Sequence, residues 1–132
     1  MVALPAKVKD FLSRPEPVKM LVTADSTGQP RGIVCGSIFI PDDETLAIGE
    51  VFMNVTKGNL LSNPKAAITV AYGGEAYNIN VTVIERSEGC EMLDLLNEKL
   101  SKMNMQAKAV WTFRVEAVFD EGINPNAGKL IS

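Results

Sequence analysis

Histidine is absent from this chain of 132 residues. Without histidine the chain cannot build a histidine-based catalytic triad, a histidine general base or most kinds of zinc site. It has only two cysteines, Cys35 and Cys90, too few for a structural zinc site or an iron–sulfur cluster within one chain. Any redox or group-transfer chemistry is therefore expected to come mainly from a bound cofactor.

Long hydrophobic runs and an excess of basic residues are also missing. No apolar run approaches the ~20 residues that a membrane helix needs, and the start, Met-Val-Ala-Leu-Pro, lacks the pattern of a secretion signal. The net charge of −3 argues against binding to a nucleic-acid backbone. The two cysteines lie far apart without a second pair, which favours a reduced, cytoplasmic protein.

The composition that remains is that of a globular protein. Apolar residues make up 46% of the chain and charged residues 22%. The length suits a single domain, which we expect over residues 1–119. Residues 120–132 are rich in glycine, asparagine and proline, and we expect them to form a loosely packed C-terminal tail.

Hydrophobic periodicity and turn residues predict a mainly β (α+β) fold. The six predicted strands cover residues 18–24, 31–40, 45–49, 65–72, 76–86 and 108–119. The predicted helices are an N-terminal one over 4–14, a short one near 54–63 and a longer one near 88–105 that Ser87 would cap. Short turns join most strands, so the sheet should be mostly antiparallel, curled into a small barrel with helices at its ends.

The segment from Asn54 to Pro64 is the sharpest local feature, because it follows a strand and opens a helix. The start of a helix offers unpaired N–H groups and partial positive charge. Thr56 adds a hydroxyl and Lys57 a full charge, a combination that suits a phosphate group. The alternative is that Asn54 or Thr56 is an ordinary N-cap and that Lys57 is a solvated surface residue.

A second feature is the pair of glycines in the strand near residue 35. Gly32 and Gly36 point to one face of this strand. Glycine inside a strand marks a bulge, a barrel bend or the close approach of a ligand, and a flat ring would fit against such a bare patch. Cys35 either touches that ligand or fills the core, and Trp111 has the same two alternatives.

These motifs resemble those of the pyridoxamine 5'-phosphate oxidase-like family of FMN-binding split barrels. The most specific match is Thr56-Lys57, several helical positions, and then Leu61-Ser62-Asn63-Pro64-Lys65-Ala66-Ala67-Ile68. The order of elements agrees over roughly residues 5–119. The resemblance implies a six-stranded split β-barrel that forms a homodimer, with FMN at the subunit interface.

The resemblance also implies roles for individual residues. Thr56 and Lys57 would hold the FMN phosphate, and Asn59 would support the phosphate or the ribityl chain. The flavin ring would be lined by Val34, Cys35, Gly36 and Ser37, together with Gly49 and Glu50. Trp111 would reach the flavin of the partner subunit.

The chain departs from true pyridoxamine-phosphate oxidases in two ways. It has Thr56 where those enzymes carry a second positive charge, and it ends in Asn-Ala-Gly-Lys-Leu-Ile-Ser rather than in a basic segment. Oxidation of vitamin B6 is therefore not expected. The short family members indicate an FMN-binding protein that transfers electrons or acts as an oxidoreductase on an unknown partner or substrate. The alternatives are a deazaflavin- or NAD(P)H-dependent reductase on the same fold, and a flavin-free binding module.

Overall fold

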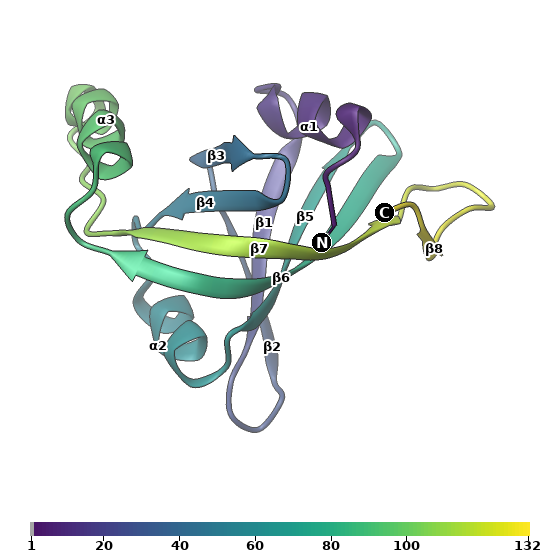
Figure 1. Cartoon of the computed structure of the whole chain (residues 1–132), viewed down its shortest axis with the longest axis horizontal. Coiled ribbons are helices and arrows are strands. Elements are labelled where there is room, and N and C mark those ends of the chain that lie inside the picture. The colour runs from purple at the N-terminus through teal and green to yellow at the C-terminus, as the bar shows by residue number, and fades with distance from the viewer. Residues whose placement is uncertain (1) are drawn as a thin grey trace.

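The computed structural model describes residues 2–132, which form one strongly curled sheet with helices at its margins (Figure 1). The elements in chain order are α1 (Ala6–Ser13), β1 (Val18–Ala24), β2 (Pro30–Val34), β3 (Ile38–Asp42), β4 (Thr45–Gly49), α2 (Asn54–Ser62), β5 (Lys65–Tyr72), β6 (Glu75–Ser87), α3 (Glu91–Leu100), the 3₁₀-helix η1 (Ser101–Met103), β7 (Val110–Asp120) and β8 (Lys129–Leu130). No helix in the described part of the chain is long and apolar enough to cross a membrane.

The sheet follows the order β2-β1-β5-β6-β7-β4-β3, with β8 added beside β7 and every pair antiparallel. The two outermost strands of this path, β2 and β3, are consecutive in the chain. Residues 35–37 join them: the Cys35 N–H donates to the Lys19 carbonyl (2.9 Å), and the Ser37 carbonyl accepts from the Gly49 N–H (3.4 Å). The sheet thus curls without closing, which is the split-barrel architecture that the resemblance implies.

The prediction of six strands was wrong in number, because the sheet has eight. The predicted strand over residues 31–40 is two strands, β2 and β3, separated by residues 35–37. The backbone pairs with β1 before this break and with β4 after it. The additional strand β8 pairs with the end of β7, and the Ile131 N–H donates to the Val118 carbonyl (2.8 Å).

The longest helix is shorter than the predicted 88–105. It begins at Glu91 with Cys90 at the N-cap, and Ser87 is instead the last residue of β6. After Leu100 the chain tightens into η1, which ends at Asn104 in the left-handed region (φ 56°). Strand β6 therefore extends further than expected, because its pairing with β7 continues as far as Ser87 opposite Val110.

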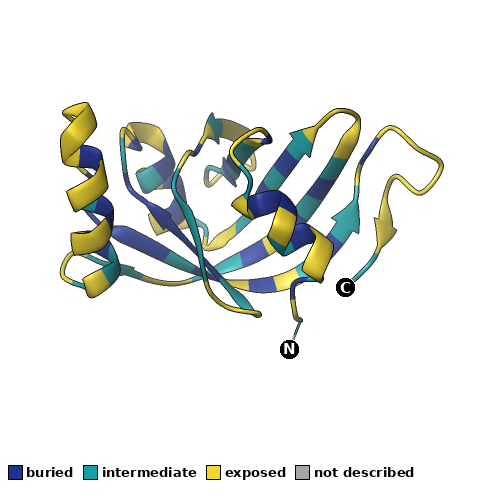
Figure 2. Cartoon of the chain, turned by 90° about the horizontal axis from the view of Figure 1, so that it is seen from above, coloured by how far each residue is buried: buried dark blue, intermediate teal, exposed yellow. Residues whose placement is uncertain are grey.

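Two hydrophobic clusters hold these elements together. The buried stretches of the helices and strands are dark blue in Figure 2. The larger cluster fills the barrel, where α1 contributes Val8, Phe11 and Leu12 as predicted. The smaller packs α3 against the ends of β4 and β7 through its buried leucines. Gly49 permits this contact, since a Cβ there would lie 2.2 Å from Leu96 Cδ2.

Candidate functional site

An apolar pocket of about 250 Å³ opens where residues 35–37 cross between the two ends of the sheet. None of its lining residues carries a charge. They are Ile33, Val34, Cys35, Gly36, Ser37, Gly49, Val51, Phe52, Met53, Leu100, Met103 and Met105. The sheet supplies one part of the wall and the α3–η1 segment another, so segments distant in sequence meet here. Such a pocket suits a flat, weakly polar group.

A second, cationic pocket of about 320 Å³ adjoins the first. Its lining residues are Glu50, Phe52, Met53, Asn54, Lys57, Gln106 and Lys108. Phe52 and Met53 line both pockets and so form their common boundary. The two ammonium groups come from the first turn of α2 and from the approach to β7. An apolar pocket and a cationic pocket therefore lie on the two sides of this boundary.

The cationic pocket lies at the start of α2. This helix begins at Asn54 with Met53 at the N-cap, and no side chain caps it. Neither Asn54 nor Thr56 is therefore an N-cap. The first N–H groups of an uncapped helix have no intrahelical acceptor and carry partial positive charge. Backbone and side chains thus concentrate positive charge at this end of the pocket.

Glu50 lies on the floor of the cationic pocket and is only 4% exposed. Arg86 binds both carboxylate oxygens of Glu50, because Nε donates to Oε1 (2.8 Å) and Nη2 donates to Oε2 (3.0 Å). The Trp111 indole N–H donates to Oε1 as well (2.8 Å). The Arg86 hydrogen bonds hold the pKa of Glu50 below its ordinary value despite burial, and Lys57 acts in the same direction. Glu50 is therefore a carboxylate at neutral pH.

The structure brings most of the predicted site residues together. Five of them line the apolar pocket: Val34, Cys35, Gly36, Ser37 and Gly49. Glu50 and Lys57 line the cationic pocket. The other three line neither pocket. Thr56 is buried, Asn59 donates through Nδ2 to the Thr23 hydroxyl (3.1 Å), and Trp111 is buried in the core beneath Glu50.

Cys35 lines the apolar pocket but is itself buried. Burial raises the pKa of its thiol to about 11, with a smaller opposing effect from Lys19. Since the thiolate is the reactive form of cysteine, Cys35 at neutral pH is an apolar wall residue and not a nucleophile.

Sequence reasoning missed Lys108, Gln106 and Phe52, which complete the cationic pocket. Lys108 lies about fifty positions after Lys57, and no local pattern marks it. The backbone explains its place: the Lys108 N–H donates to the Glu50 carbonyl (3.0 Å), and the Glu50 N–H donates to the Ala109 carbonyl (2.8 Å). Only the pairing of the segment after β4 with the segment before β7 brings Lys108 to the pocket.

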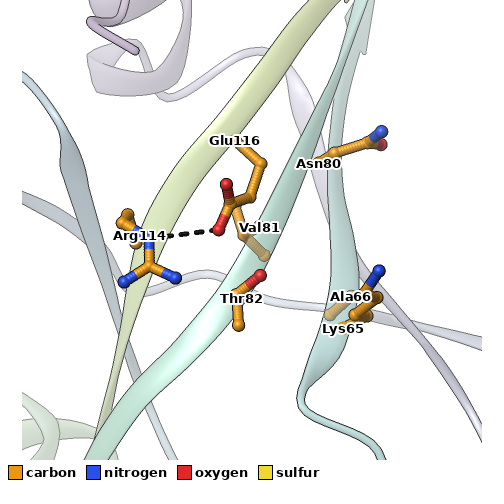
Figure 3. A pocket seen from close by; sticks show the side chains of 7 residues that line it. All are labelled: Lys65, Ala66, Asn80, Val81, Thr82, Arg114 and Glu116. Carbon is orange, nitrogen blue, oxygen red and sulfur yellow. Dashed lines mark hydrogen bonds and ion pairs between the residues drawn. The ribbon is translucent and has the colours of Figure 1, made fainter. Parts of the chain in front are cut away.

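A third hollow lies on the outer face of β5, β6 and β7 (Figure 3). It shares no lining residue with the other two pockets. It is larger, about 650 Å³, and is lined mainly by polar side chains. Its charges are partly paired, because Arg114 Nε donates to Glu116 Oε1 (3.1 Å). The register between β6 and β7 shifts at Glu116, which lies between the residues that pair with Asn80 and Val81. We define this hollow as the outer-face hollow.

The open, curled antiparallel sheet with its site at the split defines a split-barrel protein. The family model described as Pyridoxamine 5'-phosphate oxidase matches residues 4–121, and the chain belongs to this family. An uncharacterised protein of Methanocaldococcus jannaschii is 30% identical over 120 residues, which cover 87% of this chain and 80% of that protein.

Solved structures share the fold at lower identity. HupZ from Group A Streptococcus is 24% identical with a TM-score of 0.77, covering 97% of this chain and 100% of that one. An FMN-binding protein from Syntrophomonas wolfei is 16% identical with a TM-score of 0.79, covering 86% of this chain and 83% of that one. Structures of the same fold also include an F420 reductase and HutZ, the heme storage protein of Vibrio cholerae, with TM-scores of 0.64 and 0.60. The fold therefore accommodates different cofactors.

Proposed function

We propose that this protein is an FMN-binding flavoprotein that transfers electrons or acts as an oxidoreductase, and that it works as a homodimer with FMN at the subunit interface. One observation carries the proposal: an uncharged, apolar pocket shares the boundary residues Phe52 and Met53 with a pocket that presents two lysines at an uncapped helix start. FMN has the same polarity, with a flat ring at one end and a phosphate at the other.

The cationic pocket fits the phosphate. A phosphate monoester carries between one and two negative charges near neutral pH. Lys57 and Lys108 would neutralise this charge, and the first N–H groups of α2 would donate to its oxygens. Lys108 thus supplies the second positive charge that the motif Thr56-Lys57 lacks. Arg86 already neutralises Glu50, so this carboxylate opposes the anion less than an unpaired one would.

The apolar pocket fits the ring. Gly36 has open space where a side chain would stand, which leaves room for a flat ligand, and Cys35 adds a small apolar surface. Bound FMN would supply hydride or electron transfer, and the chain would bind the ring, orient it and shield it from water. The pKa of Glu50 is lowered and that of Cys35 is raised, so neither group changes protonation between pH 6 and 8.

The experiment that tests the proposal is the absorption spectrum of freshly purified protein, followed by titration with FMN. The expected result is the spectrum of oxidised flavin, bleached by a chemical reductant. A deazaflavin spectrum would favour the reductase alternative, and a colourless protein that binds no flavin would favour the binding module. A heme spectrum would contradict the proposal; its ligand in this chain would have to be a residue other than histidine.

A further inference from the structure

Phe52 combines two properties that are unfavourable for a phenylalanine. Its backbone lies in the left-handed region (φ 56°), which bulky L-residues rarely adopt. Its side chain is 79% exposed, so folding buries little of the aromatic ring. Among the described residues that are not glycine, Asn104 also has a positive φ. Asparagine is a usual residue for that conformation.

The left-handed turn itself has a clear structural purpose. Residues 50–53 lead the chain from β4 into α2, and the turn at Phe52 brings the start of α2 to the cationic pocket. Glycine or asparagine would make this turn with less strain. The backbone conformation is thus explained by the fold, and the choice of phenylalanine is not.

The position of the ring supplies an explanation. Phe52 lines both pockets, beside buried Met53, at the boundary between the apolar and the cationic end. A ligand that spans both ends must pass this boundary. Planar rings pack favourably against aromatic side chains, so a bound ring would cover the apolar surface that Phe52 now exposes.

We infer that Phe52 is a ring-contacting residue that determines the affinity of this site for the flavin ring, as distinct from its phosphate. The inference rests on the proposed function and deepens it. The ring of Phe52 contacts the flat part of FMN, and the lysines hold the charged end. Phe52 therefore contributes equally to the binding of FMN and of riboflavin, which has the same ring and no phosphate.

The test compares wild type with Phe52→Asn and the conservative Phe52→Tyr, each titrated with FMN and with riboflavin. Phe52→Asn should weaken the binding of FMN and of riboflavin by the same factor, about 10-fold. Phe52→Tyr should bind both ligands with the affinity of wild type. Without flavin, Phe52→Asn should unfold at a slightly higher temperature, because asparagine tolerates the left-handed conformation better. Lys57→Ala is the matched control and should weaken the binding of FMN but not that of riboflavin.

Three results would overturn the inference without contradicting the proposal that the protein binds FMN. In the first, wild type and Phe52→Asn bind FMN with equal affinity and also bind riboflavin with equal affinity. In the second, Phe52→Asn binds FMN more weakly than wild type but binds riboflavin equally well. In the third, the loss of affinity is accounted for wholly by dissociation of a dimer, measured by light scattering. The last result would mean that a second copy, rather than the ring, covers Phe52. A wild type that binds neither flavin would instead reject the proposed function, and the inference with it.

Discussion

Glu50 combines nearly complete burial with a full negative charge. Its carboxylate joins the end of β4 to Arg86 on β6 and to Trp111 on β7, so three strands are tied together beneath the cationic pocket. Burying a carboxylate without partners is very costly, whereas here both oxygens accept hydrogen bonds. The network therefore holds the floor of the site in one arrangement, and its loss should be measurable as a loss of stability.

Replacement of Glu50 by glutamine should lower the free energy of unfolding by about 2–3 kcal/mol at pH 7, because Arg86 would lose its charged partner. The pKa of Glu50 is lower in the folded protein than in the unfolded chain. Its stabilising effect is thus fully present above the ordinary pKa of about 4.3 and is lost as the pH falls through the folded value. The difference between wild type and Glu50→Gln should therefore shrink in acid.

Urea denaturation between pH 3 and 7 measures this difference. Glu116→Gln is the matched control, since Glu116 is exposed and also has a lowered pKa, but pairs with Arg114 on the surface. It should change stability little at any pH. A difference between wild type and Glu50→Gln that stayed constant from pH 7 to pH 3 would show that the ionised form of Glu50 is not what stabilises the fold.

Lys57 and Lys108 should contribute separately to phosphate binding. A charge-assisted hydrogen bond is worth about 1.5–3 kcal/mol. Lys57→Ala and Lys108→Ala should therefore each weaken FMN binding about 10- to 100-fold, and neither should alter riboflavin binding. Fluorescence titration of both ligands gives the ratio, with Lys65→Ala in the outer-face hollow as a control that leaves FMN affinity unchanged. An unchanged FMN affinity in Lys108→Ala would leave Lys57 as the sole cation of the site.

At the scale of elements, local patterns predicted most of the secondary structure. Strands β1, β4 and β5 have the predicted bounds, because each is a short apolar run between turn residues. The break between β2 and β3 could not be predicted in this way. It is a change of hydrogen-bonding partner, from β1 to β4, and it leaves the apolar character of the segment unchanged. Ser87 was misassigned as the cap of α3 for a similar reason, since its pairing with Val110 of β7 extends β6 by one residue beyond the predicted end.

The packing of α3 on the sheet gives a prediction at this scale. Leu96 is buried against the bare backbone of Gly49, while the next residue toward the N-terminus, Leu95, is 53% exposed. Leu96→Ala should lower the free energy of unfolding by about 2–4 kcal/mol, through lost burial and a residual cavity. Leu95→Ala, the matched control, should change it by less than about 1 kcal/mol. Equal effects of the two substitutions in urea denaturation would mean that α3 does not pack as described.

At the scale of the molecule, the site was only partly predictable from the sequence. Lys57 stood out because the chemistry of its motif is local: a strand end, a hydroxyl, a cation and a helix start occur together. Lys108 reaches the same pocket from another strand, and Phe52 is notable only for its backbone conformation and exposure. Long-range pairing and dihedral angles have no simple signature in a single sequence. The burial of Trp111 likewise depends on a partner, Glu50, that is 61 positions away.

The whole molecule also leaves apolar surface that one chain does not cover. Val34 is 71% exposed beside the apolar pocket, and Leu61 on α2 and Ile84 on β6 are exposed as well. A closed pair related by a two-fold axis is the commonest way to bury such surface. Light scattering should therefore give twice the 14.3 kDa mass of one chain. The mass of a single chain at working concentrations would contradict the homodimer.

If FMN binds at the subunit interface, dimer formation and FMN binding must be linked. A ligand that binds the dimer and not the separated chains stabilises the dimer by mass action. Saturating FMN should then move dissociation of the dimer to a lower protein concentration, measured by sedimentation of a dilution series. Lys57→Ala should weaken this shift at a fixed FMN concentration, because less FMN is bound, and should leave the dissociation of the flavin-free dimer unchanged. A dimer that binds FMN, yet dissociates at the same protein concentration with and without it, would place the flavin within a single subunit and away from the interface.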